Sequence, residues 1–509
     1  MVVTVVSHTI VGTITLPKLT ATLIKTGPEA LIRPIVDALG IRKIVDRLCP
    51  MDRPSGITHG QVIEALVYNR LLDPSPLCHV ADWFENAGMA QVLGFSADKV
   101  NDDRLARALE AVAYANEDIH TAATLQAVSA FDLDTRLVHH DTTSFYFTGD
   151  YDEQEWITYG YSRDKRPDTK QMNLALTING DGVPLDHTVL PGNENDVTGM
   201  KARMDALKNR LPEGSRLVVT DRGMVSADNL RSLRAQGFDF IASLKLTEPQ
   251  KDVIRAVPLD QFQPVEDQPF HVHEDQWLVG TVPCRVVVIY SEDKAKRDAA
   301  RRQRQLNEIR QGLSVIHAGL NKGRLKDRDA VRDKIRDLLK GANMMPYFDF
   351  KVELVAGSLT MRVMERADLL AKDEQMDGIY ALVTNLTEPD GPEILRQYKS
   401  RAKIEQRIKD MKSHLRLRPI FVHTEERIHG LVLVNVLALL VYSLLEVALR
   451  RMGRDETARK ILRHFQGATF AHATGPDGSA LVFEVVPPKP EESQLLAGIA
   501  AAVRANKAA

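Results

Sequence analysis

The spacing of apolar residues changes near residue 130, and this change separates a helical region from a sheet. Between residues 29 and about 130, apolar residues recur at helical intervals interrupted by prolines. Beyond that point they alternate, as strand residues do, over three runs: 136–147, 171–178 and 184–190. The last two runs are joined by Asn179-Gly180-Asp181-Gly182, a strong hairpin signal. A sheet that begins with antiparallel strands is therefore expected after a helical region.

Helices and strands then alternate along the chain. The pattern predicts helices at about 197–210 and 226–236 and strands at 215–220 and 238–243. Three strands followed by helix, strand, helix and strand is the order of an RNase H-like core, although composition alone does not separate this core from other α/β sheets. A segment from 245 to about 375 interrupts this order. It holds strand-like runs at 278–282, 285–290 and 348–354, and a strand at 378–384 follows it.

The expected fold class is therefore α/β, with an RNase H-like core interrupted by a mixed β/helical insertion and preceded by an all-helical N-terminal domain. At 509 residues, several domains are expected. Weak alternation in residues 1–25 indicates a short strand or an extended arm. The predicted domains are a helical accessory domain that could bind DNA (1–130), a first core part (131–244), an insertion (245–375), a second core part with the signature helix described below (376–450) and a C-terminal region (451–509).

Composition limits the classes of protein to consider. Three cysteines without C-x-x-C spacing argue against a zinc cluster or a disulfide framework. The first residues lack the basic segment of a signal peptide. The longest apolar run, 430–445, is shorter than the roughly 20 residues that a membrane span needs, so a buried helix is expected there.

Charge is distributed unevenly along the chain. The net charge of −2 argues against a simple nucleic-acid-binding function, because nucleic-acid-binding proteins usually carry an excess of basic residues. However, residues 294–340 hold 15 Lys/Arg against 6 Asp/Glu, and residues 391–430 hold 10 against 5, whereas residues 1–130 hold 11 against 14. A DNA track is therefore expected in the second half of the chain, although the 294–340 run also fits a solvated helical hairpin.

Three acidic residues stand out by their positions. Asp141 and Asp221 end the strand-like runs 136–141 and 216–221, and Glu405 lies in a helical stretch, 398–412. Taken singly, each has an ordinary explanation, since Asp forms turns and Glu405 can pair with Arg401 or Lys409 across one helical turn. Together they could supply the oxygen ligands of a pair of divalent cations.

The residues around Glu405 are more specific. Tyr398, Arg401, Glu405 and Lys412 fit the pattern Tyr-x2-Arg-x3-Glu-x6-Lys, and the last three recur at +4 and +7 on one helical face. A metal-binding carboxylate flanked by cations and an aromatic ring suits the binding of DNA phosphates.

By these residues the chain resembles the DDE transposases of bacterial insertion sequences, in the group with this signature. The resemblance covers roughly 130–450 and includes 184 positions between the second and third acidic residues and a loop at 160–171. It implies that Asp141, Asp221 and Glu405 bind two Mg²⁺ or Mn²⁺ ions and are catalytic. It also implies that the protein acts as a homodimer on DNA, where it binds transposon ends and target DNA. The implied location is the cytoplasm, away from any membrane, with the protein associated with the nucleoid when it is bound to DNA.

The resemblance further implies DNA contacts outside the acidic triad. Tyr398, Arg401 and Lys412 would hold the transposon end near the scissile phosphate. Some relatives stack a flipped base on a tryptophan of the insertion, and Trp277 is the only tryptophan there, although a strand Trp is more often a core residue.

Two other functions stay open. An RNase H-like nuclease or resolvase would cut DNA without joining it, and a catalytically silent DNA-binding regulator would do neither. The signature helix favours the transposase over the first alternative, and the intact acidic triad argues against the second.

Overall fold

Strand β4 (Leu137–Tyr146) organises the sheet of the first unit, because one of its neighbours runs antiparallel to it and the other parallel. In the computed structural model of the protein, β4 pairs antiparallel with β5 (Gln171–Asn179), which pairs antiparallel with β6 (Pro184–Pro191). On its other side, β4 pairs parallel with β7 (Arg216–Thr220). The order β6-β5-β4-β7 is that of an RNase H-like core, as the sequence predicts.

The structure describes residues 2–6, 13–14, 20–25, 27–51, 56–194, 200–210, 216–474 and 480–504. They form two units, one of Met1–Phe240 with Tyr398–Ala509 and one of Ile241–Gln397. The second contains the predicted insertion, and β8 (Phe238–Leu244) and α14 (Gly391–Lys399) are the elements through which the chain enters and leaves it.

The turn between β5 and β6 forms at the predicted residues. The Asn179 side-chain oxygen accepts hydrogen bonds from the backbone N–H groups of Asp181 (3.0 Å) and Val183 (2.9 Å), and Gly182 takes a φ of +86° that favours glycine. All nine residues of β5 are buried, so both faces of the sheet are covered there. Helix α8 (Met200–Arg210) and helix α9 (Ala227–Ala235) flank β7 in sequence, also as predicted, with residues 197–199 and 215 outside the described part of the chain.

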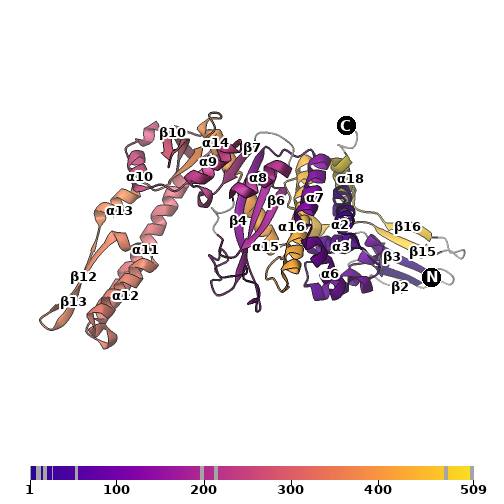
Figure 1. Ribbon diagram of the computed structural model, residues 1–509, viewed down its shortest axis with the longest axis horizontal. Helices are drawn as coiled ribbons and strands as arrows, with labels where there is room; N and C mark the ends of the chain where they lie inside the picture. The colour runs from indigo at the N-terminus through magenta and orange to yellow at the C-terminus, as the bar shows by residue number, and fades with distance from the viewer. Residues whose placement is uncertain are drawn as a thin grey trace. The chain divides into compact units, whose positions relative to one another are not determined.

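Helix α16 (Glu425–Arg451) is the central element of the first unit. Every residue from Gly430 to Leu445 is buried, which confirms the buried helix expected at this apolar run. It lies between β6 and the helices α3, α6 and α7 (Figure 1). By length and composition it is the one helix of the described residues that could cross a membrane, but 94% of its most apolar window is buried within the protein. It is therefore the core helix of this unit.

The region before the sheet is helical from Glu29 onward. Its helices are α1 (Glu29–Leu39), α2 (Ile41–Leu48), α3 (His59–Leu72), α4 (Val80–Asn86), α5 (Met89–Leu93), α6 (Asp102–Ala113) and α7 (Asn116–Phe131). Earlier residues form strands β1 (Val2–Val6), β2 (Thr13–Ile14) and β3 (Thr20–Lys25), so the domain is not helical throughout. These strands join β15 (Thr469–Thr474) and β16 (Ala480–Val486) in the order β16-β15-β3-β1-β2, a long-range pairing that local alternation does not reveal.

The C-terminal part of the first unit adds three further helices. They are α15 (Ala402–Ser413), α17 (Ala458–His464) and α18 (Pro490–Arg504). Helix α18 packs on α1, α7 and α16, so the chain end closes the helical layer.

The second unit contains strands and an arm. The strands follow the order β8-β14-β11-β10-β9, in which β8 begins in the first unit, with β14 at Ile379–Thr384, β11 at Val282–Ser291, β10 at Phe270–Val279 and β9 at Gln263–Pro264. The arm consists of α11 (Glu292–Gly319) and α12 (Arg328–Gly341) side by side with the ribbon β12 (Phe348–Val355) and β13 (Ser358–Glu365) (Figure 1). Shorter helices α10 (Glu248–Arg255) and α13 (Ala367–Glu374) complete it.

One predicted strand of the insertion is wrong. The run 278–282 is not one strand, because residues 280 and 281 form the turn between the end of β10 and the start of β11, where Gly280 has a φ of +61°. Strand β10 begins at Phe270 instead, and its sequence carries charged and polar residues on exposed positions that hide the strand pattern. The basic segment 294–340 forms the helical hairpin, as one of its two interpretations predicted.

Gly430 allows the closest approach between helices in this core. A Cβ atom at this position would lie 2.2 Å from the backbone oxygen of Leu109 on α6, far inside van der Waals contact. We expect Gly430→Ala to lower the free energy of unfolding by about 1–3 kcal/mol, the usual cost of overpacking. Thermal unfolding measures the change. Gly341→Ala is the control, since nothing lies within 4 Å of its Cβ position and its φ is ordinary for a helix, and an equal loss in both variants would contradict the packing argument.

Candidate active site

The parallel register of β4 and β7 places two of the predicted carboxylates at neighbouring positions. Val138 pairs with Val218 and His139 with Val219, and the same register continued by two residues sets Asp141 opposite Asp221. The Thr220 hydroxyl donates to the backbone oxygen of His140 at 3.4 Å, which extends the contact between the strands.

Asp141 lies inside its strand, as the predicted strand 136–147 requires, and not at the end of a run 136–141. β4 continues for five residues to Tyr146, because Thr142–Tyr146 pair antiparallel with β5. The parallel pairing of β4 with β7, by contrast, ends at His139. Beyond His139, the edge of β4 that faced β7 is unpaired among the described residues, which leaves room for a carboxylate. Asp221 does follow the end of β7, where its side chain accepts from the N–H of Arg222 at 2.6 Å.

The signature residues lie on two helices rather than one. α14 ends at Lys399 and α15 begins at Ala402, so Tyr398 is on the first helix and Glu405 on the second. At the break, tight hydrogen bonds join the N–H of Arg401 to the oxygen of Tyr398 (3.1 Å) and the N–H of Ile404 to the oxygen of Arg401 (3.0 Å). The Ser400 hydroxyl is hydrogen bonded to Nε2 of His139 at 3.1 Å, which ties the break to β4.

The Arg401 guanidinium lies among all three predicted carboxylates. Its nitrogens lie 2.7 Å from Glu405 Oε1, 3.6 Å from Asp221 Oδ2 and 3.9 Å from Asp141 Oδ2. The Arg401 side chain is only 12% exposed, whereas those of Asp141, Asp221 and Glu405 are 21%, 42% and 60% exposed. Burial tends to lower the pKa of Arg401, but Asp141 and Asp221 outweigh it and raise that pKa. The structure thus brings together four of the predicted site residues: Asp141, Asp221 and Glu405 surround the positive charge of Arg401.

These residues open into a cleft of about 310 Å³. Its walls come from β4, from the turn after β7 and from α15, and they consist of Asp141, Thr142, Thr143, Arg163, Asp221, Gly223, Met224, Glu405 and Ile408. All three carboxylates therefore face the same space, which is accessible from solvent through Glu405 and Asp221.

Asp141 is the least exposed of the three carboxylates and the most perturbed. Burial raises the pKa of Asp141 to about 6. The Arg401 charge and the N–H of Thr142, which donates to Oδ1 at 2.9 Å, act against this rise, and Asp221 adds to it. A carboxylate that is costly to ionise and lies in a cleft is typical of a position that holds a cation or a proton in function.

The two histidines before Asp141 are both neutral. His139 shares the face of Asp141, and burial lowers its pKa to about 4, with Lys403 and Arg401 adding to the effect. His140 points to the opposite face, where its Nδ1 is hydrogen bonded to the hydroxyl of Thr177 at 2.8 Å, and burial lowers its pKa to about 3. Of the two histidines, only His139 therefore lies near the site, and its Nε2 is hydrogen bonded to the Ser400 hydroxyl.

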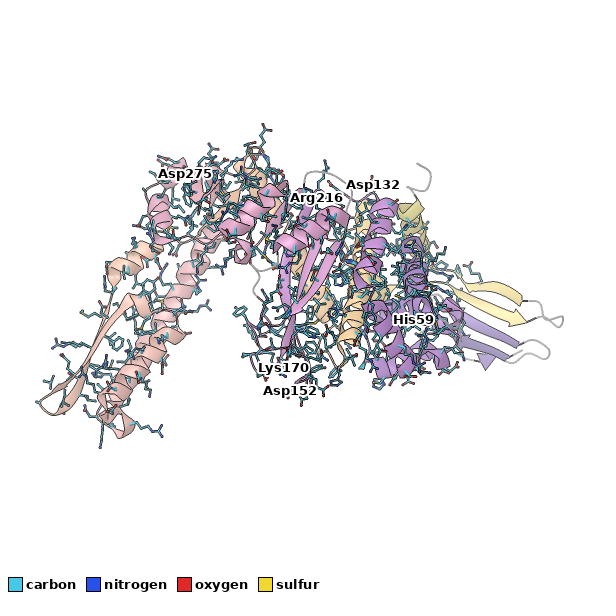
Figure 2. The ribbon with its side chains drawn as sticks, viewed as in Figure 1. His59, Asp132, Asp152, Lys170, Arg216 and Asp275 are labelled. Atoms are coloured by element: carbon cyan, nitrogen blue, oxygen red, sulfur yellow. The ribbon has the colours of Figure 1, made fainter. Side chains whose placement is uncertain are left out.

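Lys412 reaches the loop before β5 rather than the open cleft. Its ammonium donates to Oδ1 of Asp164 at 2.8 Å, and Arg418 contacts the same oxygen at 2.6 Å. Lys412 and Asp164 are 9% and 7% exposed, so this pair is largely shielded from water. The base of the loop is fixed by the ion pair between Lys170 and Asp152 (Figure 2).

The two predicted aromatic contacts lie in different units. Tyr398 lies in the last turn of α14 and is half-buried near Arg401, whose pKa it helps to raise. Trp277 lies on β10 of the second unit, where its Nε1 donates to Asp275 at 2.6 Å (Asp275 is labelled in Figure 2). Trp277 is half-buried, so part of its ring is open to solvent.

The donor set suits hard divalent cations. Three carboxylates gather around one positive group, and oxygen ligands are those that Mg²⁺ and Mn²⁺ prefer. Within the described ranges, however, no three Asp, Glu, His or Cys side chains already converge closely enough to hold an ion. The guanidinium of Arg401 occupies the space that the three carboxylates share, so cations could bind there in its place.

Three residues of this region were missed from the sequence. Ser400, Asp164 and Arg418 fix the break and the loop through contacts with His139 and Lys412. Asp164 belongs to the loop that the resemblance marked, but nothing in the sequence signals its pairing with a lysine 248 positions away.

Comparison with known proteins supports this assignment of the core. The family model described as a transposase DDE domain matches residues 131–441, and a model described as a domain of unknown function (DUF4277) matches residues 29–122. No curated protein matches the chain. A solved piggyBac transposase synaptic complex with hairpin DNA is similar at a TM-score of 0.41 and 10% identity, over 86% of this chain and 78% of that one. This structural likeness is too distant to bear on function.

The pKa of Asp141 predicts a pH dependence of stability. Its folded value of about 6 exceeds the unfolded value of about 3.9, so the folded chain binds this proton more tightly. The stability cost of Asp141 is therefore absent below about pH 4 and grows as the pH rises towards 6. In EDTA we expect Asp141→Asn to be more stable than the unmodified protein at pH 7, by up to about 3 kcal/mol, with no difference near pH 4.

Urea unfolding at several pH values measures this difference. Asp260→Asn, at an exposed position in the second unit, controls for the loss of one charge. A difference for Asp141→Asn that does not change between pH 4 and 7 would contradict the burial of its charge.

Proposed function

The chain belongs to the transposase DDE domain family, and from this premise we propose that it cuts the ends of an insertion sequence and joins their 3′-hydroxyls to target DNA. The proposal includes the bacterial group with the Tyr-x2-Arg-x3-Glu-x6-Lys signature. The single observation that carries it is the convergence of Asp141, Asp221 and Glu405 on one cleft around Arg401.

Asp141, Asp221 and Glu405 would hold two divalent cations, Mg²⁺ or Mn²⁺. When bound, such a pair activates an attacking hydroxyl and stabilises the leaving oxygen of a phosphodiester. The chain itself contributes the geometry. The β4–β7 register sets the distance between the two aspartates, and the break at Ser400 aims the start of α15 at them.

Arg401 would pass from the carboxylates to the DNA. Its Nη1 is buried and has no hydrogen-bond partner among the described residues, so it is available to a phosphate oxygen. Tyr398, beside it, would contact the transposon end. Lys412 would reach a phosphate by exchange with Asp164, whose second cation, Arg418, would keep the loop in place.

Further parts of the proposal concern partners and location. Trp277 would stack on an unpaired base, for which its partly exposed ring is suited. Two protomers would hold two element ends, so a homodimer on DNA is proposed. The protein would act in the cytoplasm, associated with the nucleoid when bound.

Cleavage of its own DNA tests the proposal most directly. The substrate is a duplex that ends in the terminal repeat of the element encoding this chain, incubated with Mg²⁺ and a second DNA. We expect cleavage at the repeat boundary and joining to the second DNA. Glu405→Gln should reduce both by at least about 100-fold, because a lost metal ligand removes several kcal/mol of transition-state stabilisation.

The control for that substitution is Glu308→Gln, which removes an exposed glutamate on α11 and should leave cleavage unchanged. Metal-dependent nicking without joining would favour the nuclease or resolvase. Binding without any cleavage by the unmodified protein would favour the silent regulator.

Metal binding can be tested without catalysis. A ligand that binds only the folded protein raises its unfolding temperature. We expect Mg²⁺ or Mn²⁺, added after EDTA treatment, to raise the unfolding temperature of the unmodified protein but not that of an Asp141→Asn, Asp221→Asn double variant. An equal rise in both proteins would place the bound ions elsewhere.

A further inference from the structure

A second cleft, of about 350 Å³, lies in the first unit beyond the C-terminal end of α15. It is formed by the segment that follows α3, by the segment that follows α15 and by α17. Three arginines line it: Arg416, Arg459 and Arg463, all of them exposed. Neither the catalytic triad nor the signature residues take part in this cleft.

The arginines of this cleft have no acidic partners. Among the described residues that line it, Asp73 is the only carboxylate, and the guanidinium groups of Arg416, Arg459 and Arg463 form no ion pair with any part of the chain that the structure describes. Neighbouring cations behave differently, since Arg454 and Lys460 both pair with Glu456. The cleft therefore presents three guanidinium groups that no ion pair among the described residues neutralises.

Helix α15 connects this cleft to the catalytic cleft. Glu405, Lys409 and Ser413 follow one another at intervals of four residues, so they form one ridge of the helix. Lys409 is exposed and, like the arginines, pairs with no carboxylate in the described ranges. After burial, Arg459 and Lys409 are the main causes that lower the pKa of His414, which places both charges around the end of the helix.

We propose that Lys409, Arg416, Arg459 and Arg463 form a basic track that binds the phosphate backbone of the DNA whose scissile bond lies in the catalytic cleft. Guanidinium groups bind phosphate oxygens in a bidentate manner, and here they need not first leave a carboxylate. This inference rests on the proposed function, since it assigns the path of that DNA.

The length of α15 gives the track a scale. At roughly 1.5 Å per residue, the helix rises by about 6 Å from Glu405 to Lys409 and by about 12 Å to Ser413, which lines the arginine cleft. Phosphates along one strand of a duplex advance by about 3.4 Å each, so the arginines of the track begin about three to four nucleotides from the scissile phosphate.

Salt-dependent binding tests the track. The triple variant Arg416→Gln, Arg459→Gln, Arg463→Gln is compared with the unmodified protein on the element-end duplex in EDTA, by fluorescence anisotropy. Each lost phosphate contact should reduce the slope of log K against log salt by about one, so we expect a slope smaller by two to three and at least about tenfold weaker binding near 0.1 M salt. A duplex of unrelated sequence should lose affinity equally, because phosphates carry no sequence information.

Two controls make the result specific. Arg47→Gln removes an exposed arginine on α2 that forms no ion pair with a described residue, and it should change neither slope nor affinity. If this variant lost as much affinity per charge as the triple variant, the effect would be a general electrostatic attraction, and the track would be overturned. Duplexes cut back to within about three base pairs of the scissile position on one side should bind both proteins equally. A difference that persists on the shortest duplexes would also overturn it.

The failure of the track and the failure of the proposed function are separable. If the unmodified protein cleaves and joins DNA while the triple variant binds with an unchanged slope, the track is wrong and the transposase stands. If the unmodified protein binds DNA without cleaving it and the slope still falls in the triple variant, the track stands and the transposase is wrong.

Discussion

The mutual repulsion of three carboxylates is the constraint on which the site depends. The β4–β7 register fixes Asp141 beside Asp221, and burial makes the charge of Asp141 costly, as its pKa of about 6 reflects. Such an arrangement needs a positive charge in its midst. Arg401 supplies it here, within 3.9 Å of all three acidic groups, and the same electrostatic demand would be met by divalent cations during function.

The scaffold around the site resists this repulsion through packing. Strand β5 is buried along its whole length and α16 is buried from Gly430 to Leu445, so the sheet that carries Asp141 is held from several sides. The ties at the edge of the site are polar instead. Ser400 binds His139, and Asp164 holds Lys412 and Arg418, which sets the positions of α15 and of the loop before β5. Hydrophobic burial thus provides rigidity, and hydrogen bonds orient the polar groups around the carboxylate cleft.

Much of the core could be predicted because its signals are local. The alternation of β4, β5 and β6 and the Asn179 turn depend on neighbouring residues, and all were found within a residue or two. The errors arise where contacts distant in sequence decide the structure. Asp141 seemed to end a strand because the pairing that extends β4 comes from β5, and the signature helix is broken because Ser400 meets a histidine 261 positions away. Strand β10 was misplaced because its exposed charged residues hide the alternation.

The net charge of −2 also becomes understandable from particular pairs. Seven of the fifteen basic residues in 294–340 form ion pairs among the described residues, as Arg310 does with Glu365 and Arg302 with Asp377, so the excess of cations in that segment is partly neutralised. Exposed pairs of this kind contribute little to stability, but they do neutralise each other's field. The cations around the end of α15 that form no ion pair among the described residues are few, yet three of them line a single cleft. For a polyanion, such a local concentration matters more than the total charge of the chain, because screening limits each charge to a range of about 8–10 Å.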